Sequence, residues 1–301
     1  MNSAIAPVQK KVVAPQQAAE ISFLVPMYNG LELTRACLRS LEETVDLARH
    51  EVVLINDAST DGTAEFLATL SAPYRVIHNS QRSSYAASIN RGVALARGEM
   101  LCLLNNDLVF SPGWLPPMLQ AFERFQNVGI VGNVQIDGRT GRYNHMGMLF
   151  SEDGVPSHFG EHFPFRPFRG WTEWKAVTSA CWLVRKSVFL AGGGYNEAYR
   201  NAGYEDTELC LSLLKLGYRH YVANESVIKH FVNSSEGRLQ FESQNAQYFG
   251  ERWHDYIVSQ FTAQDRRRIA ANYLLRCLGE LSRCRVKKLG KALATLLTCG
   301  H

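Results

Sequence analysis

Residues 100–107 read MLCLLNND, a short apolar run that ends in two amides and an acid. An apolar run without polar alternation predicts a strand that is buried on both faces, as in a parallel sheet. In open α/β sheets, ligands bind just outside the carboxyl ends of the strands, and a carboxylate there suits a hard divalent cation. Asp107 is therefore the first candidate site residue, although an acid at a strand end can also simply cap the next turn.

Similar apolar runs lie upstream and alternate with helical patterns. The predicted strands are residues 21–26, 51–56, 74–78 and 100–104, and the predicted helices are residues 31–48, a segment that follows the turn 58–63 and runs to residue 70, and residues 84–97. This alternation predicts an α/β fold with a mostly parallel central sheet and helices on both of its faces.

The pattern is looser after Asp107. The predicted elements are a helix at 114–125, strands at 128–131 and 176–185, a helix from 204 to 216, two short strands at 218–223 and 227–230, and helices beyond residue 236. Residues 133–175 are rich in Gly, Pro, His and aromatic residues and show little periodicity. Long irregular segments of this kind are usually binding loops.

The chain divides into three predicted parts: a disordered leader at 1–20, a single domain at 21–235 and a helical, basic extension at 236–301. The leader has no apolar run suited to a signal peptide, and no stretch approaches the roughly 18 consecutive apolar residues of a membrane span. Seven scattered cysteines form no Cys-x-x-Cys pair, which indicates reduced packing thiols. These features predict a cytoplasmic protein, either soluble or peripheral on the inner face of the membrane.

The extension carries most of the positive charge. Residues 265–301 contain nine Lys or Arg against two acids, while the whole chain has a net charge of only +4. Leucines at helical spacing lie between these cations, which is typical of a helix on anionic lipid and equally of a helix packed on the domain with its basic face in solvent. No recognition motif points to nucleic acid as a partner.

Polar residues also follow two earlier strands. Asp57 comes directly after the strand 51–56, and the segment Pro26–Gly30 follows the first strand, with the Tyr28 ring available to stack on a base. Because parallel strands end at one edge of the sheet, these residues and Asp107 predict a nucleotide crevice. Neither a dinucleotide-binding glycine motif nor a P-loop is present, so a metal ion must hold the phosphates.

The order of these motifs resembles that of the family 2 glycosyltransferases of GT-A fold. The resemblance covers about residues 20–235. The matching stretches are VPMYN at 25–29, VLINDASTDGT at 53–63, NRG at 90–92, LNND at 104–107, SACWLV at 179–184, GGYNE at 193–197, YED at 204–206 and KH at 229–230.

The resemblance implies roles for the nucleotide and metal residues. It implies that Asp57 accepts a hydrogen bond from the imide of a pyrimidine base. Asn105-x-Asp107 stands where the family has Asp-x-Asp, so Asp107 would bind Mg²⁺ or Mn²⁺, with His230 as a further ligand from the far side. A strand-end histidine that bonds a backbone carbonyl is the alternative for His230. The residues implied to line the base, ribose and phosphate pocket are Pro26, Tyr28, Asn29, Asn90, Asn105 and Asn106.

The catalytic residues follow in the same way. The resemblance implies that Asp206 is the base that deprotonates the acceptor hydroxyl, with Glu205 orienting sugar or acceptor and Trp182 facing the acceptor. Acids in the first turn of a helix can instead serve only to satisfy free N–H groups. Core or loop packing explains the other histidines and tryptophans of residues 145–174 equally well, and they lack the ligand spacing of a zinc site.

The resulting expectation is an inverting, metal-dependent glycosyltransferase. It would move a sugar from a UDP- or dTDP-linked donor to a hydroxyl of a cell-surface glycan or a lipid-linked oligosaccharide, and the versions of the motifs resemble rhamnosyltransferase-like members, which favours dTDP-rhamnose. A nucleotidyltransferase would instead carry a Gly-rich, basic loop after the first strand. A non-catalytic glycan-binding module would not need Asp107, Asp206 and His230 together.

Overall fold

The computed structural model describes residues 20–232 and 238–298, so almost all of the predicted leader lies outside the described residues. The first half alternates strands and helices as predicted. Its elements are β1 (Ile21–Met27), α1 (Leu31–Thr44), the short 3-10 helix η1 (Leu47–Arg49), β2 (Glu51–Asn56), α2 (Thr63–Leu67), β3 (Tyr74–His78), α3 (Tyr85–Leu95) and β4 (Met100–Leu104).

The second half is less regular. Its elements are β5 (Leu108–Val109), α4 (Leu115–Arg124), β6 (Val128–Asp137), β7 (Tyr143–His145), β8 (Met148–Phe150), β9 (Pro156–His158), β10 (Trp171–Trp174), β11 (Cys181–Arg185), α5 (Lys186–Ala191), α6 (Glu205–Lys215), β12 (Arg219–His230), η2 (Arg238–Phe241), α7 (Glu242–Ser259), α8 (Ala263–Gly279), η3 (Leu281–Arg283) and α9 (Val286–Thr298).

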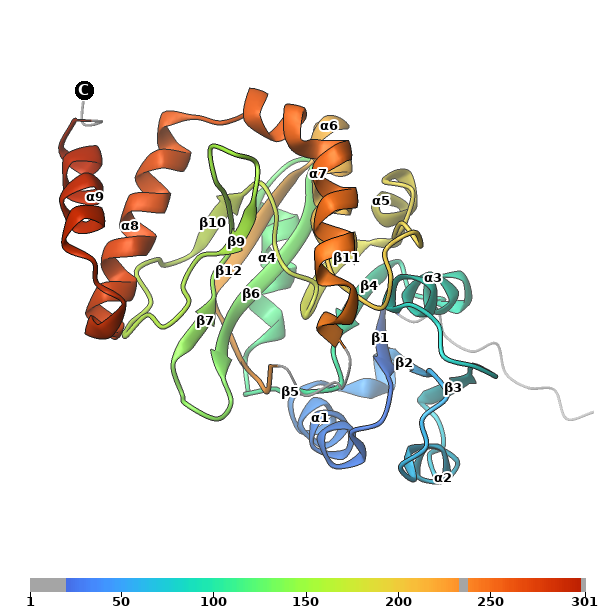
Figure 1. Cartoon of the computed structure of the whole chain (residues 1–301). Helices are drawn as coiled ribbons and strands as arrows, with labels where there is room; N and C mark the ends of the chain where they lie inside the picture. The colour runs from blue at the N-terminus through green and yellow to red at the C-terminus, as the bar shows by residue number, and fades with distance from the viewer. Residues whose placement is uncertain (1–19, 233–237, 299–301) are drawn as a thin grey trace, which may run out of the picture.

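The central sheet has the strand order β10-β12-β6-β11-β4-β1-β2-β3. The strands β4, β1, β2 and β3 pair in parallel, as their unbroken apolar sequences predict. The strand β11 is inserted antiparallel between β4 and β6, and β12 then runs parallel to β6. The carboxyl ends of β1, β2, β4, β6 and β12 consequently meet at one edge, which is the geometry that the site requires (Figure 1).

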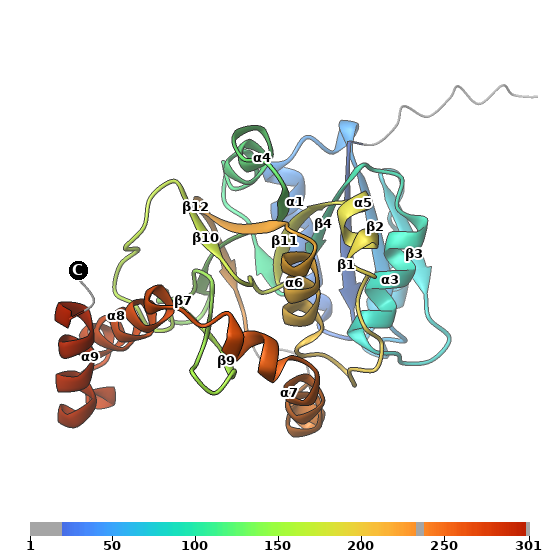
Figure 2. The same cartoon turned by 90° about the horizontal axis from the view of Figure 1, so that it is seen from above.

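Helices cover both faces of this sheet. The helices α1 and α4 lie on one side, and α6 and α7 lie on the other (Figure 2). The apolar side chains of β1 and β4 alternate between two buried clusters, so that Leu24 and Leu103 belong to one cluster and Phe23 and Cys102 to the other. Burial on both faces explains why these strands have no polar alternation, and confirms the predicted fold class.

Several predicted boundaries are wrong. The helix predicted at 31–48 ends at Thr44, because Val45 is extended and Asp46 caps a separate short turn by accepting from Ala48 N. The strand predicted at 176–185 begins only at Cys181. The two strands predicted at 218–223 and 227–230 form one strand, β12, with a shift of register between Ala223 and Val227. Four short strands, β7 to β10, lie within the segment predicted to be irregular.

The extension after residue 236 is helical, as predicted, and its first two long helices pack on the domain. Asp265 on α8 pairs with Lys175 at 2.6 Å, and Asn272 of the same helix accepts from the backbone N–H of Gly160 at 3.1 Å. The helix α7 adds Phe249, Trp253 and Ile257 to the core. None of the described helices is long and apolar enough to cross a lipid bilayer.

Candidate functional site

A pocket of about 550 Å³ opens at the carboxyl edge of the sheet. Residues from the ends of β1, β2, β4 and β12 line it together with β7, β9 and the start of α6. Of the residues predicted for the site, those that line the pocket are Pro26, Tyr28, Asp57, Asn105, Asn106, Asp107, Glu205, Asp206 and His230.

Asp57 is held rigidly on one side of this pocket. Its Oδ1 accepts hydrogen bonds from Asn79 Nδ2 at 2.6 Å and from the Ser83 hydroxyl at 2.9 Å. The backbone N–H of Ser83 donates to both oxygens, at 2.9 Å and 3.1 Å. Because Oδ1 has most of these partners, Oδ2 is the oxygen with capacity left to accept from a ligand.

Tyr28 lies on the same side. The guanidinium of Arg82 sits 3.9 Å from the centre of the Tyr28 ring, as a cation–π contact. One face of the ring is therefore covered, so a stacked base would use the other face or take the place of the guanidinium. Arg82 was not singled out in the sequence, because its role depends on the position of Tyr28 in space.

Asn29 and Asn90 do not line the pocket, which corrects the expectation from the resemblance. The Asn29 side chain accepts from Thr60 N at 2.8 Å and so ties the turn after β1 to the turn after β2. Asn90 donates to the backbone oxygen of Tyr195 at 2.8 Å and accepts from its N–H at 3.0 Å. Both amides hold backbone segments that come from distant parts of the sequence.

The two amides after β4 line the pocket and are also hydrogen-bonded within the protein. Asn105 Oδ1 accepts from the hydroxyl of Tyr85 at 3.2 Å. Asn106 Nδ2 donates to Thr34 Oγ1 at 2.9 Å. The first position of the Asn-x-Asp motif thus carries a neutral acceptor that is shared with a tyrosine.

Asp107 and His230 come together because β5 pairs with the end of β12, where Leu108 lies opposite His230. Asp107 Oδ1 and His230 Nε2 are 3.2 Å apart, and both side chains are buried. Neither of these two atoms makes a hydrogen bond within the protein. The other ring nitrogen of His230, Nδ1, lies 2.9 Å from Gln135 Oε1.

This arrangement fits a cation. With the Gln135 amide oriented so that its oxygen accepts from His230 Nδ1–H, the Nε2 lone pair of His230 points at a carboxylate oxygen, which is also an acceptor. Two buried acceptors that face each other repel unless a proton or a metal ion lies between them. Carboxylate and imidazole are both ligands of Mn²⁺, and Gln135 acts as the outer partner that fixes the ring. Among the described residues, no three His, Cys, Asp or Glu side chains gather around one metal position.

Asp206 and Glu205 open α6, after a left-handed Tyr204 with φ of 76°. Asp206 Oδ2 accepts from Ser179 N at 3.0 Å and from Thr178 Oγ1 at 3.2 Å, and the side chain is only partly buried. Glu205 is buried and accepts from Gly203 N at 2.6 Å. Both acids therefore satisfy N–H groups, as acids at a helix start do, and Asp206 also faces the pocket.

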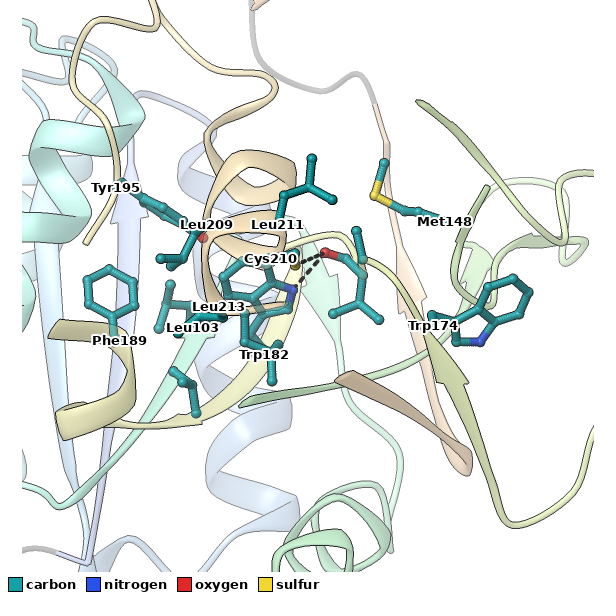
Figure 3. Packing of buried hydrophobic residues seen from close by; sticks show 14 of the residues in the cluster. Leu103, Met148, Trp174, Trp182, Phe189, Tyr195, Leu209, Cys210, Leu211 and Leu213 are labelled. Atoms are coloured by element: carbon teal, nitrogen blue, oxygen red, sulfur yellow. Dashed lines mark hydrogen bonds between the residues drawn. The ribbon is translucent and has the colours of Figure 1, made fainter. Parts of the chain in front are cut away.

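Trp182 does not face an acceptor site, which corrects that prediction. Its side chain is fully buried, and its Nε1–H donates to the Val177 carbonyl at 3.2 Å (Figure 3). The indole packs among Leu103, Tyr195 and Leu209 in the cluster beneath α6. The strand β11 lies between two other strands and is covered on both faces, so its alternate residues have no route to the pocket.

Two histidines of the pocket, attributed to packing from sequence, are missing from the predicted site. His145 and His158 line it with their Nδ1 atoms 2.9 Å apart, so that one proton is shared between the rings. Burial lowers the pKa of His145 well below the usual range. The only hint in the sequence is that both lie in the segment predicted to form binding loops.

The pocket is strongly acidic. Among its described lining residues, Arg82 is the only Lys or Arg. Six carboxylates line it: Asp57, Asp107, Glu161, Glu205, Asp206 and Glu242. An anionic ligand would meet net repulsion here unless a cation accompanied it.

The chain matches the model of the family described as Glycosyl transferase family 2 over residues 22–192, more than half of its length. A relative from Sinorhizobium fredii, the uncharacterized protein y4gI, is 28% identical over 81% of this chain but only 28% of its own length. The O-antigen biosynthesis protein RfbC of Myxococcus xanthus is 30% identical over 76% of this chain and 19% of its own length. The chain therefore spans less than a third of either of these two relatives.

A third relative is matched over more of its length. The N-acetylglucosaminyl-diphospho-decaprenol L-rhamnosyltransferase of Mycobacterium tuberculosis is 26% identical over 61% of this chain and 67% of its own length.

Two solved structures share the fold. One is GalNAc-T7 with UDP, GalNAc and Mn²⁺, with a TM-score of 0.63 and 14% identity over 92% of this chain and 55% of that chain. The other is a mannosyltransferase from Pyrobaculum calidifontis with GDP-Man and Mn²⁺, with a TM-score of 0.56 and 18% identity over 96% of this chain and 79% of that chain. At these identities, the likeness shows the fold alone.

Proposed function

The chain belongs to glycosyl transferase family 2, and we propose that it is a metal-assisted, inverting transferase that uses a UDP- or dTDP-linked sugar. The proposed acceptor is a hydroxyl of a cell-surface glycan or of a lipid-linked oligosaccharide. The observation that carries the proposal is that Asp107, Asp206 and His230, far apart in the sequence, line one pocket. The name of the relative from Mycobacterium tuberculosis, an L-rhamnosyltransferase, makes dTDP-rhamnose the first donor to test.

Asp57 supports a pyrimidine donor. Uracil and thymine carry a ring N–H between two carbonyl groups, whereas cytosine has no such donor. Asp57 Oδ2 retains capacity to accept this hydrogen bond, because the contacts with Asn79 and the Ser83 hydroxyl fall on Oδ1. Those contacts also fix the carboxylate before the base arrives, which reduces the entropy lost on binding.

The acidity of the pocket supports a divalent cation. A diphosphate could not approach six carboxylates without a counter-charge, and Asp107 with His230 offers the acceptor pair to hold one. When bound, Mg²⁺ or Mn²⁺ would neutralise the charge that develops on the leaving diphosphate. Phosphate oxygens and water would complete the coordination, since the described residues offer no third His, Cys, Asp or Glu there.

Asp206 is the proposed base. The acceptor hydroxyl attacks the anomeric carbon, its proton passes to Asp206, and the electron pair of the breaking sugar–phosphate bond leaves with the nucleoside diphosphate. A single displacement of this kind inverts the anomeric configuration. The hydrogen bonds from Ser179 N and Thr178 Oγ1 hold the Asp206 carboxylate in place for this step.

A thermal-shift screen of UDP-, dTDP- and GDP-sugars, with Mn²⁺ and with EDTA, tests the donor and the metal together. A ligand at a hundred times its Kd stabilises the native state by about 2.7 kcal/mol, which raises Tm measurably. We expect a shift with a UDP- or dTDP-sugar that requires Mn²⁺ and that Asp107→Asn abolishes. A shift with GDP-sugars alone, or an equal shift in EDTA, would contradict the donor or the metal, respectively.

The stereochemistry is tested separately. Proton NMR of the first-formed product should show the anomer opposite to that of the donor. Retention would remove the single-displacement step while leaving family membership untouched.

A further inference from the structure

The helix α9 carries an uncovered apolar stripe. Val286, Leu293 and Leu297 are 85%, 47% and 79% exposed. They are separated by seven and four residues, so they lie on one face of the helix. Apolar side chains gathered on one exposed helix face indicate a surface that binds another protein or a membrane.

The helix that carries this stripe is attached to the domain through α8. The helix α9 packs on α8 through another side, where Ala292 is buried. The helix α8 is itself anchored to the domain by the Asp265–Lys175 ion pair. As a result, α9 lies at the outer edge of the molecule, beyond α8, in both views (Figures 1 and 2).

The charge around the stripe has a single sign. Residues 281–301 contain five Lys or Arg and no Asp or Glu. Of these cations, Lys287, Lys288 and Lys291 are exposed on α9 itself. Lys287 lies beside the stripe, and Lys288 and Lys291 lie farther round the helix, so α9 has an apolar face and a basic face. Such a basic amphipathic helix matches the boundary between the acyl chains and the phosphates of an anionic bilayer.

We propose that the α9 stripe docks on a membrane surface that contains anionic phospholipid. Val286, Leu293 and Leu297 enter the headgroup region, and the lysines contact lipid phosphates. Docking by itself does not depend on the proposed transfer. Its use, which is to bring the pocket to a lipid-linked acceptor, rests on the proposed function.

A second copy of the chain is the less favourable occupant. A symmetric contact through the stripe would bring the two basic α9 helices next to each other, and residues 281–301 contain no acid that could pair with their lysines. Like charges at an interface oppose association. The charge therefore favours an anionic surface over another molecule of the same protein.

Vesicle sedimentation with the full chain tests the proposal. The probes are vesicles of phosphatidylcholine alone and of equal parts phosphatidylcholine and phosphatidylglycerol, each at low and high salt. We expect binding to the anionic vesicles that falls with salt, and a loss of at least about tenfold in affinity for the double variant Lys287→Glu/Lys291→Glu. Arg39→Glu/Arg142→Glu, at two exposed cations outside α9, changes the net charge by the same amount and should bind like the wild type.

The apolar contribution is tested with Leu293→Ser/Leu297→Ser, and Leu216→Ser at another exposed leucine serves as its control. The stripe variant should lose vesicle binding and keep the wild-type Tm, because both side chains are exposed. Equal binding to both lipid mixtures, or wild-type binding by the stripe variant, would overturn the proposal. So would light scattering that shows a dimer which the stripe variant dissociates.

The two proposals fail independently. Nucleotide-dependent thermal shifts should be the same in the α9 variants as in the wild type. If vesicle binding is absent while those shifts remain, only the membrane surface is wrong. If the shifts are absent while the vesicles bind, only the proposed transfer is wrong.

Discussion

Two groups of residues in the pocket differ in whether their buried polar atoms make hydrogen bonds within the protein. We call Tyr28, Asp57, Asn105 and Asn106 the donor rim, where every buried side-chain oxygen and nitrogen has a hydrogen-bond partner. We call Asp107, Gln135, Asn144, His145 and His230 the metal rim, where each residue has a buried polar atom that makes no hydrogen bond within the protein.

One group is already held in place by hydrogen bonds, whereas the other keeps polar atoms that a ligand could use. An unpaired buried polar atom costs about 1–3 kcal/mol, so a cluster of five persists only because the rest of the fold imposes it. The donor rim is complete without a ligand, whereas the metal rim would be completed by the proposed cation. An Asp-to-Asn substitution on the donor rim should therefore lower the stability of the protein. The same substitution on the metal rim should leave the stability unchanged or higher and should lower the affinity for a cation.

The largest expected effect is at Asp206, which lines the pocket and belongs to neither rim. Asp206→Asn should lower transfer by about 10²–10⁴-fold, the usual contribution of a general base, while nucleotide and Mn²⁺ still raise Tm. Initial rates with the donor found by the thermal-shift screen measure this. Asp153→Asn, an exposed acid outside the pocket, is the matched control. Wild-type rates in Asp206→Asn would remove it from the base role.

The same change made on each rim tests the comparison directly. Asp57→Asn should destabilise the protein by about 1–3 kcal/mol, because its new N–H₂ group faces donors from Asn79 and Ser83. Asp107→Asn should be neutral or stabilising without metal, because it removes a charge that faces a lone pair. Urea unfolding in EDTA measures both. An equal loss of stability in Asp107→Asn would mean that Asp107 and His230 stabilise each other as an ion pair without a metal. The proposed difference between the two rims would then be wrong.

A pH dependence of stability follows from His220, which contrasts with the open metal rim. His220 Nδ1 accepts from Ile130 N, its Nε2 lies 2.9 Å from the Cys210 carbonyl, and burial lowers its pKa to about 4. The unfolded state, with a pKa near 6.5, binds the proton first as pH falls. Stability should be complete above about pH 6.5 and fall by roughly 2 kcal/mol by pH 5.

Urea unfolding at pH 7 and pH 5 measures this loss. His220→Gln should be less stable than the wild type at pH 7 but should show a smaller difference between the two pH values. Burial lowers the pKa of His145 in the same direction, so part of the slope remains in that variant. A slope unchanged by His220→Gln would contradict the assignment.

The smallest expected effect is a local one at Ser84, which follows the Ser83 that bonds Asp57. Ser84 caps α3 by accepting from Ala87 N at 3.1 Å. Ser84→Ala should cost about 1 kcal/mol and Ser84→Gly only a few tenths, because glycine is a tolerated cap. Thermal unfolding compares the two variants. A loss several times larger for Ser84→Ala would mean that the donor rim depends on α3 more than its hydrogen bonds indicate.

Much of the fold could be predicted from local pattern. The strands β1, β2, β3 and β4 are within one residue of the predicted ranges, because continuous burial on both faces gives each an unbroken apolar run. The two-residue strand β5 and the continuity of β12 could not be predicted. Both depend on pairing between residues at least ninety positions apart, which no window of sequence contains.

The residues of the site also differ in whether the sequence could predict them. Asp57 and Asp107 could be found as acids at the ends of apolar strands. Trp182 was misassigned because the motif that contains it does not tell which face of β11 is covered. Gln135, His145 and His158 were missed, since a polar residue in an irregular segment looks the same whether it faces a pocket or solvent.

The sequence by itself determined the strands β1 to β4 and showed that β2 and β4 are followed by acids, because both depend on periodicity and turn chemistry within a few residues. Only the tertiary structure decided which polar atoms are satisfied. The partners of Asp57 lie 22 and 26 residues away, and that of His230 lies 95 residues away. A hydrogen bond needs its two atoms within about 3 Å, and chain closure over such lengths places them there only in the completed fold.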